Sequence, residues 1–337
     1  MRFWGYWTKG KLDILQRYLD AFTTATKNKA PKTIYIDAFA GDPENRDRLT
    51  GEPIEGSATL ALSVTDPPFT HLRFFETAGK AERLQTSLRK SFPDRDIKVL
   101  GGDCNELIPQ ELDRLRALDW APTFAFIDPN GMEAEWQTLE ALAHFKHRRR
   151  WKVEIFLLFS PRMLVRLLPV QGGAVYPAHT AKIDRLFGTQ DWRQIYGARL
   201  QQLIEPGQAL QEYLNLMRWR LEEILGYEWT HPIEIRNERG DTIYYMVFAT
   251  DHPVGDEIMR DVYAKAAEEF PKMREEARRF RKQQEDKQHG VQSLFGAEDQ
   301  ELWGPIQPGE RFYEHEPPTE PWFLDPSACS PRSFPTE

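Results

Sequence analysis

Cysteine is scarce in this chain of 337 residues, which contains only Cys104 and Cys329. One pair cannot form the disulfide framework of a small secreted domain, and no Cys-x-x-Cys motif is available to bind zinc. The eight histidines form no His-x-Glu or His-Glu-x-x-His pattern, so we expect no metal site. A Gly-x-Gly-x-x-Gly sequence is also absent, which disfavours a nicotinamide-dependent dehydrogenase.

Long apolar runs are missing as well. The longest of them, such as residues 155–159, are far too short to cross a bilayer. The N-terminal residues contain no apolar segment of the kind that secretory signal peptides carry. These absences predict a soluble, cytoplasmic protein that has no membrane partner.

Most of the chain carries nearly equal numbers of positive and negative residues. Residues 291–337 carry nine Asp and Glu and two Arg, which leaves residues 1–290 at a net charge of −1 out of a total of −8. A nearly neutral body argues against a general nucleic-acid coat protein and permits a local basic patch. Hydrophobic residues make up 40% of the sequence and aromatic residues 12%, which is enough for a packed core.

Short apolar segments alternate with helical segments in the first half of the chain. An N-terminal helix comes first, because Leu12, Leu15, Leu19 and Phe22 share one helical face before Pro31. Nearly all-apolar strands separated by helices then predict a doubly wound α/β fold, in which helices cover both faces of a parallel sheet. The predicted strands are residues 33–37, 72–76, 97–100, 123–128 and 153–159.

The second half of the chain adds further elements to this sheet. We predict a helical insertion over 161–226 and one long, charged helix over 255–288, with a β-hairpin between them whose strands are 229–235 and 242–250. The tail is rich in proline and acid and cannot build a core, although its aromatic residues suggest that it docks somewhere. The expected organisation is a helix (1–30), an α/β core (31–160), the insertion, the hairpin (227–254), the long helix and the tail (289–337).

Acidic residues stand at the ends of four successive predicted strands. They are Asp37, Glu76, Asp103 and Asp128, separated by 39, 27 and 25 residues. The carboxyl ends of parallel strands meet at the edge where open α/β sheets bind ligands. A carboxylate such as Glu76 can accept hydrogen bonds from both hydroxyls of a ribose, and Asp103 can accept one from an adenine amino group. Each acid alone is more typical of a helix N-cap, but the four together favour a nucleoside site.

This set of strand ends resembles that of class I S-adenosylmethionine-dependent methyltransferases, whose seven-stranded sheet ends in an antiparallel hairpin. Residues 4–260 resemble one family in particular, the three-Cys-motif partner proteins (TcmP). Members of that family look like methyltransferases and are named for a separate partner protein. The similarity is carried by Trp7-Thr8-Lys9-x-Lys11-Leu12, Tyr35-Ile36-Asp37-Ala38-Phe39-Ala40-Gly41, Gly56-Ser57, Gly102-Asp103-x-Asn105, Asp128-Pro129-x-Gly131, Trp136 and Tyr244-Tyr245.

The resemblance implies S-adenosyl-L-methionine as the cofactor and a three-Cys-motif protein as the partner. It also assigns roles to residues at the strand ends. The implied cofactor contacts are Asp37, Phe39, Ala40 and Gly41 around the methionine part, Gly56 and Ser57 at the start of the following helix, Glu76 at the ribose, and Asp103 at the adenine.

Two further features concern this cofactor edge. Cys104 follows Asp103 and is grouped with the cofactor-side residues, and we expect its thiol to fill a small buried space. The usual second glycine of the first loop is replaced by Asp42-Pro43-Glu44, which departs from the family pattern. That replacement brings extra acid close to the expected methionine carboxylate.

Asp128, Pro129 and Asn130 stand where the methyl acceptor should lie, and they are the candidate catalytic residues. Amino-group methyltransferases of nucleic acids carry Asp-Pro-Pro-aromatic here, where the acid orients an exocyclic amine and the ring stacks on the base. Gly131 removes that ring, as in the similar Asp-Pro-x-Gly of tRNA guanine N2-dimethyltransferases. Trp136 is a candidate replacement, although packing is its more typical role. Neither cysteine is placed to act as the nucleophile of pyrimidine carbon-5 methylation.

Two groups of basic residues are candidates for contacts with a substrate or partner. Arg162 and Arg166 follow the predicted strand 153–159 on the same edge as the acids, so we expect them to bind substrate phosphate. Residues 146–152 contain five Lys and Arg, but they precede that strand and therefore belong to the opposite edge. A solvated turn is one interpretation of that basic segment, and a phosphate or partner patch is the other.

Two functions from different classes are consistent with these features. The first is a methyltransferase that uses S-adenosylmethionine on an amine of a nucleic acid or nucleotide and works with the three-Cys-motif partner. The alternative is a catalytically weak or inactive protein of the same fold that binds this partner. A pocket at the edge that carries Asp37 and Asp103 would favour the enzyme, and a filled edge would favour the alternative.

Overall fold

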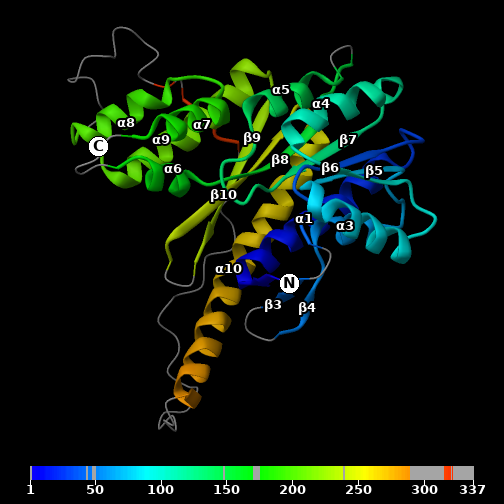
Figure 1. Ribbon diagram of the computed structural model, residues 1–337, viewed down its shortest axis with the longest axis horizontal. Helices are drawn as coiled ribbons and strands as arrows, with labels where there is room; N and C mark the ends of the chain where they lie inside the picture. Colours follow the sequence, from blue (N-terminus) through cyan, green and yellow to red (C-terminus); the bar gives the residue numbers. More distant parts are fainter. Residues whose placement is uncertain are drawn as a thin grey trace.

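The chain folds around a seven-stranded sheet with the strand order β6-β5-β2-β7-β8-β10-β9 (Figure 1). The computed structural model describes residues 2–42, 45–47, 51–146, 149–169, 175–237, 240–288, 315–319 and 321. Strands β2, β5, β6, β7 and β8 are parallel, and β10 runs antiparallel to both β8 and β9. The strands are β2 (Ile34–Asp37), β5 (His71–Glu76), β6 (Ile97–Gly101), β7 (Thr123–Ile127), β8 (Glu154–Phe159), β9 (Trp229–Arg236) and β10 (Thr242–Thr250).

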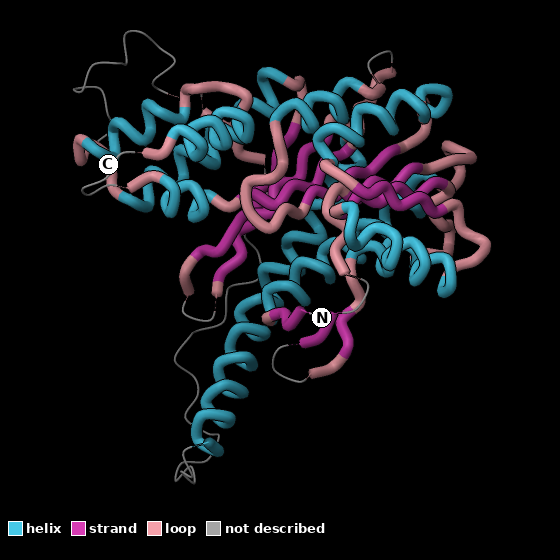
Figure 2. Tube along the Cα trace, in the orientation of Figure 1, coloured by secondary structure: helices cyan, strands magenta, loops and turns pink. Residues whose placement is uncertain are grey.

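Helices cover both faces of this sheet, as Figure 2 shows. Successive side chains of a strand point to opposite faces, so Ile34 and Ile36 of β2 join one core while Tyr35 joins the other. The predicted doubly wound α/β fold with its terminal hairpin is therefore confirmed. The helices on the Tyr35 side are α1 (Tyr6–Thr26), α2 (Ser57–Ser63), α3 (Ala78–Ser91) and α10 (Pro253–Gln288), and those on the other side include α4 (Cys104–Arg114) and α5 (Trp136–His144).

The segment after β8 is helical, as the sequence predicts. Its helices gather at the end of the sheet next to β9 and β10 (Figure 1). Their apolar side chains, among them Phe187, Trp192 and Leu216, join the same core as α4 and α5. None of the described helices is both long and apolar enough to cross a membrane. The elements of this segment are α6 (Pro161–Leu167), α7 (Pro177–Phe187), α8 (Trp192–Leu200), α9 (Pro206–Trp219) and the π-helical η2 (Arg220–Ile224).

Helix α10 lies alongside α1 (Figure 1). Arg17 of α1 donates hydrogen bonds of 2.8 and 3.0 Å to the two carboxylate oxygens of Glu269. Gly10 of α1 leaves room for the ring of Phe270, which a Cβ at that position would overlap. The helix begins at Pro253, slightly before the predicted residue 255, because proline suits a first helical position that needs no N–H donor.

A second, three-stranded sheet was not predicted. Its first strand precedes α1, within the segment 1–30 that is predicted to be a helix, and its other two strands lie between β2 and α2. Its strands are β1 (Arg2–Trp4), β3 (Asn45–Asp47) and β4 (Pro53–Ile54). Strands of two or three residues that contain charged side chains show no apolar alternation, so pattern analysis misses them. Because β1 pairs with β3, the start of the chain lies next to the loop that follows β2.

A short part of the C-terminal tail contacts the helical end of the sheet. The His315 Nε2 and Glu222 Oε1 atoms are 2.9 Å apart, and Asn215 exchanges hydrogen bonds of 2.9 and 3.1 Å with the backbone of Thr319. Docking of the tail is therefore seen at residues 315–319. The tail residues Cys329, Trp303, Phe312, Tyr313, Trp322 and Phe323 lie outside the described residues.

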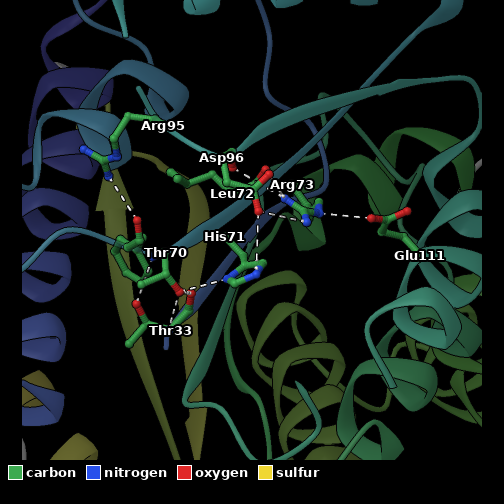
Figure 3. Close-up of polar contacts among 9 residues, drawn as sticks. Thr33, Thr70, His71, Leu72, Arg73, Arg95, Asp96 and Glu111 are labelled. Atoms are coloured by element: carbon green, nitrogen blue, oxygen red, sulfur yellow. Dashed lines mark hydrogen bonds and ion pairs between the residues drawn. The ribbon is translucent and has the colours of Figure 1, made fainter. Parts of the chain in front are cut away.

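A buried ion pair ties α4 to the sheet. Figure 3 shows Arg73 of β5 between Asp96 and Glu111. Arg73 donates from Nε to Glu111 Oε1 at 3.0 Å, and the two side chains are only 9% and 4% exposed. Burial alone would raise the pKa of Glu111, but hydrogen bonds from Lys98 and Arg114 outweigh it and the pKa lies below its usual value. The carboxylate therefore stays ionised at neutral pH.

Glu111→Ala should lower the free energy of unfolding by about 3 kcal/mol, because Arg73 would stay buried without this partner. The estimate lies at the lower end of the range for a broken buried pair, since Asp96 remains 3.4 Å from Arg73. Urea denaturation measures the change. Gln110→Ala, at an exposed position on the same helix, is the control and should shift stability by no more than about 0.5 kcal/mol. Equal effects of the two substitutions would contradict the role of the pair.

Candidate functional site

A cavity of about 930 Å³ opens at the carboxyl edge of the parallel strands. The strand order reverses between β2 and β7, and such a switch point is where open α/β sheets bind ligands. The candidate residues Asp37, Gly56, Arg162 and Arg166 do not line this cavity. The candidates that do are Phe39, Ala40, Gly41, Ser57, Glu76, Asp103, Cys104, Asp128, Pro129 and Asn130.

Asp37 at the end of β2 is completely buried. Its carboxylate accepts hydrogen bonds from the backbone N–H of Phe39 at 3.2 Å and from the hydroxyls of Tyr35 and Ser57. Burial raises the pKa of Asp37 to about 7, even though these hydrogen bonds lower it. Asp37 thus holds the loop after β2 against the start of α2, and it shapes the cavity without lining it.

The loop after β2 remains bonded to both neighbouring strands. Ala38 N–H donates to the Phe126 carbonyl of β7 at 2.9 Å, and Ala40 N–H donates to the Phe75 carbonyl of β5 at 3.0 Å. Gly41 then turns the chain with φ at +75°, a conformation that suits glycine. The backbone from Ala38 to Gly41 therefore forms a fixed wall of the cavity.

The acidic replacement in this loop is partly neutralised. Arg83 of α3 pairs with Asp42 at 2.5 Å, and the Asp42 side chain is largely buried. Asp42 does not line the cavity, while Pro43 and Glu44 lie outside the described residues. Gly56 is the N-cap residue of α2 and lies behind Ser57, which does face the cavity.

Glu76 ends β5 with its carboxylate in the cavity wall. One oxygen, Oε1, accepts hydrogen bonds from the Thr77 backbone N–H at 2.8 Å and the Thr77 hydroxyl at 3.0 Å. The other oxygen accepts none from the residues that the structure describes, although the side chain is only 9% exposed. An acceptor with these properties is suited to a donor on a bound molecule, such as a sugar hydroxyl.

Asp103 begins α4 as its N-cap, accepting a 2.9 Å hydrogen bond from the Asn105 backbone N–H. The exposed Asp103 carboxylate also lines the cavity, so capping and ligand binding are compatible. Asn105 ties this strand end to the next loop, because its side chain donates to the Glu133 carbonyl and accepts from Glu135 N–H. Burial raises the pKa of the Cys104 thiol to about 12, so that thiol is a poor nucleophile.

Asp128 at the end of β7 forms an ion pair with Lys11 of α1. Lys11 contacts the Oδ2 atom, and no described residue donates a hydrogen bond to Oδ1. Lys11 belongs to the first motif that carries the family resemblance, but no role for it was predicted from the sequence. A pairing between residues 117 positions apart in the chain cannot be read from local patterns.

Aromatic rings reach the cavity from segments other than the predicted one. Trp136 is 4% exposed, and Arg220 stacks over its ring at 4.4 Å, so it packs in the core. The rings that line the cavity belong to Trp7, Phe39 and Tyr244. They are the described residues that can stack on a flat ligand near the Asp128-Pro129-Asn130-Gly131 loop.

The cations around the cavity also differ from the predicted ones. Arg166 is exposed on α6 and contacts Met163, whereas Lys80, Lys182 and Arg185 line the cavity. Arg185 is paired with Glu135 at 2.6 Å. Helix α7, which carries Lys182 and Arg185, lies about 20 residues beyond β8 in the chain, so proximity in sequence to a strand end does not reveal it.

Comparisons with known proteins add little to this geometry. No family model matches the chain, and no curated protein matches it. Among solved structures, the chain is similar to a protein of Legionella pneumophila that is described by the family model DUF519. The two share 12% identity at a TM-score of 0.41, over 76% of this chain and 91% of the other.

Asp37→Asn should change how stability depends on pH. A folded-state pKa near 7, above the ordinary value of 3.8, means that the native state retains a proton that the unfolded chain has lost. Wild-type stability from this group is therefore present at low pH and is lost as pH rises toward 7. The variant cannot ionise, so its stability relative to wild type should rise by up to about 1.4 kcal/mol per pH unit between about pH 5 and pH 7. Urea titrations across this range measure the difference, and a pH-independent difference would contradict the raised pKa.

Proposed function

We propose that the protein is a methyltransferase that uses S-adenosyl-L-methionine on an amine of a nucleic acid or nucleotide. The observation that carries the proposal is one cavity of about 930 Å³ that gathers the ends of β2, β5, β6 and β7. Ligand cavities of this size bind molecules as large as a nucleoside with a side chain. The residues in its wall have the hydrogen-bonding capacity that such a molecule needs.

The free acceptors of the cavity suit a nucleoside. Glu76 has one oxygen without a donor among the described residues, and it would accept hydrogen bonds from ribose hydroxyls. Asp103 uses Oδ1 to cap α4 and would offer Oδ2 to an adenine amino group. The fixed backbone from Ala38 to Gly41 would lie against the methionine part, close to the hydroxyl of Ser57.

The chemistry proposed for this site is mainly a matter of position. When bound, S-adenosylmethionine supplies an electrophilic methyl group. Asp128 would accept a hydrogen bond from the acceptor amine through Oδ1 and stabilise the positive charge that the nitrogen gains. Pro129 and Asn130 would shape the acceptor side, and the rings of Trp7 and Tyr244 would orient a flat base.

The cations at the cavity favour an acceptor that carries phosphate. Lys80, Lys182 and Arg185 line the cavity, and Lys182 has no ion pair with a described residue. An ammonium group of this kind is a suitable contact for a nucleotide or nucleic-acid phosphate. A three-Cys-motif protein remains the partner that the family resemblance suggests, and we include it in the proposal on that ground.

A second candidate function is supported by the ion pair between Lys11 and Asp128. Lys11 holds the carboxylate that would serve the acceptor, so this pair also suits a protein of methyltransferase fold that binds its partner and has little or no activity. The two functions differ in one measurable property. In an enzyme, substitution of Asp128 should reduce methyl transfer, whereas in a binding protein it should leave partner binding unchanged.

The cofactor assignment is tested by the affinity of S-adenosylhomocysteine. Glu76→Ala and Asp103→Asn should each weaken binding by about 1–3 kcal/mol, because a hydrogen bond to a charged group is lost or altered. Asn at position 103 keeps a helix-capping side chain, so α4 should stay folded. Isothermal titration calorimetry gives the affinities, and Glu82→Ala at an exposed position on α3 is the control. If both variants bind as tightly as wild type, the cofactor assignment is wrong.

Methyl transfer is tested with Asp128→Asn. If the protein is an enzyme, the variant should still bind S-adenosylhomocysteine, since Asp128 is assigned to the acceptor. Transfer should fall by about 10²- to 10⁴-fold, the usual range for losing a positioned acid or base. The measurement is incorporation of tritiated methyl groups into total RNA, DNA and protein, with and without the three-cysteine partner. Wild-type incorporation no higher than that of the variant in every condition would favour the binding protein.

A further inference from the structure

A second pocket lies at the opposite edge of the sheet and shares no lining residue with the first. It has a volume of about 270 Å³ and lies where β7 and β8 begin, between the end of α1 and the start of α10. We propose that this pocket binds a small carboxylate whose body is a single apolar or aromatic ring system. The proposal stands on the polar and apolar groups of this pocket and is independent of the proposed function.

The group that points to an anionic ligand is the ammonium of Lys146. This side chain lines the pocket, yet the residue is only 6% exposed. Its ammonium forms no hydrogen bond or ion pair with any residue in the described part of the chain. An ammonium that is largely buried and has no protein partner is costly, and burial accordingly lowers the pKa of Lys146. A carboxylate in the pocket would supply the missing partner.

Three carboxylates lie near Lys146, but each is bound to other groups. Their nearby charge raises the pKa of Lys146, though less than burial lowers it. These carboxylates therefore attract the Lys146 ammonium without contacting it, and a bound carboxylate could still form a hydrogen bond with it. Glu154 accepts hydrogen bonds from the hydroxyls of Tyr18 at 2.7 Å and Thr250 at 3.1 Å. Asp251 accepts one from the backbone N–H of Lys152. Asp119 accepts one from the guanidinium of Arg149.

Glu154 in the pocket wall would not strongly repel an anion. Burial raises its pKa to about 7, so this carboxyl is substantially protonated at neutral pH. Hydrogen bonds from Tyr18 and Thr250 hold the Glu154 carboxyl group in place. Gly255 at the start of α10 packs so close to it that a Cβ at position 255 would overlap Glu154 Oε1.

Lys29 also lines the pocket and adds positive charge. Lys152 lines it too, but its ammonium is paired with Asp251 at 3.4 Å and donates to the Gly226 carbonyl at 2.8 Å.

The remaining walls are aromatic and apolar. The rings of Trp151 and His252 lie 4.6 Å apart, and Phe22, Trp120 and Ile258 complete the apolar part of the pocket. His252 Nδ1 accepts a hydrogen bond from the Val254 backbone N–H at 3.1 Å, so its proton is on Nε2 when the ring is neutral. The ring therefore offers a donor, which again suits a carboxylate.

The size of the pocket limits the ligand. Pockets for drug-sized molecules begin at about 300 Å³, so this one accommodates a molecule with one ring system and a short chain. A nucleotide is too large, and inorganic phosphate would leave the apolar walls unused. Three residues of the basic segment, Lys146, Trp151 and Lys152, would then line a ligand pocket, which is neither a solvated turn nor an open phosphate patch.

Binding of indole-3-propanoate to the full-length protein tests the proposal. Isothermal titration calorimetry should show saturable binding, and tryptamine, which carries an ammonium on a similar ring, should bind at least about tenfold more weakly. Inorganic phosphate should also bind at least about tenfold more weakly, because it cannot fill the apolar walls.

Lys146→Met provides the decisive variant. It removes a largely buried charge that has no hydrogen-bond partner among the described residues, so the unliganded variant should melt no lower than wild type. A melting transition at or above that of wild type would show that the variant folds. Its affinity for indole-3-propanoate should fall at least about tenfold. Lys90→Met, at an exposed position on α3, is the matched control and should bind as wild type does. Trp151→Leu should weaken binding while it retains the preference for the carboxylate.

Three results would overturn the proposal. The first is the absence of saturable binding with a Kd below about 1 mM. The second is equal affinity for indole-3-propanoate and tryptamine, which would show that charge does not select the ligand. The third is unchanged affinity in a folded Lys146→Met variant. None of these results depends on S-adenosylmethionine, so failure here is distinguishable from failure of the proposed function.

Discussion

The position of β2 between β5 and β7 is the constraint on which the rest of the structure depends. β2 forms parallel ladders with both neighbours, and all four of its residues are buried. The loop that leaves β2 keeps a hydrogen bond to each neighbouring strand, so the backbone of Ala38 and Ala40 is fixed before the chain turns. Asp37 then binds that loop to α2 from within the core. The chain runs outward through β5 and β6 and returns to β7, which leaves a crevice beside β2.

Much of this architecture can be predicted from sequence because period and burial are local signals. The apolar runs at β2, β5, β6, β7 and β8 predict parallel strands, and the spacing of leucines predicts α1. The small sheet of β1, β3 and β4 cannot be predicted in the same way, since its strands are too short to show a period. It is held by pairing between segments about 40 residues apart.

The site is predictable in its acids and much less so in its other side chains. Glu76, Asp103 and Asp128 line the cavity because strand ends converge at one edge. Asp37 stands at the same edge, but its side chain turns inward to its neighbours Tyr35 and Ser57, a choice that only the packed core determines. Lys11 and Arg185 reach the cavity from helices whose placement depends on tertiary packing. Arg162 and Arg166 are closer to the end of β8 in the chain, but the packing of α6 leaves them outside the cavity wall.

Helix α1 connects the two pockets of the molecule. Its first turns contribute Thr8 and Lys11 to the large cavity, and its last turns contribute Phe22 and Thr26 to the small one. A helix of 21 residues is about 30 Å long and nearly incompressible along its axis. A ligand that shifts α1 along its axis at one pocket would therefore shift the wall of the other pocket as well. By thermodynamic linkage, occupation of either pocket would then change the affinity of the other by the same factor.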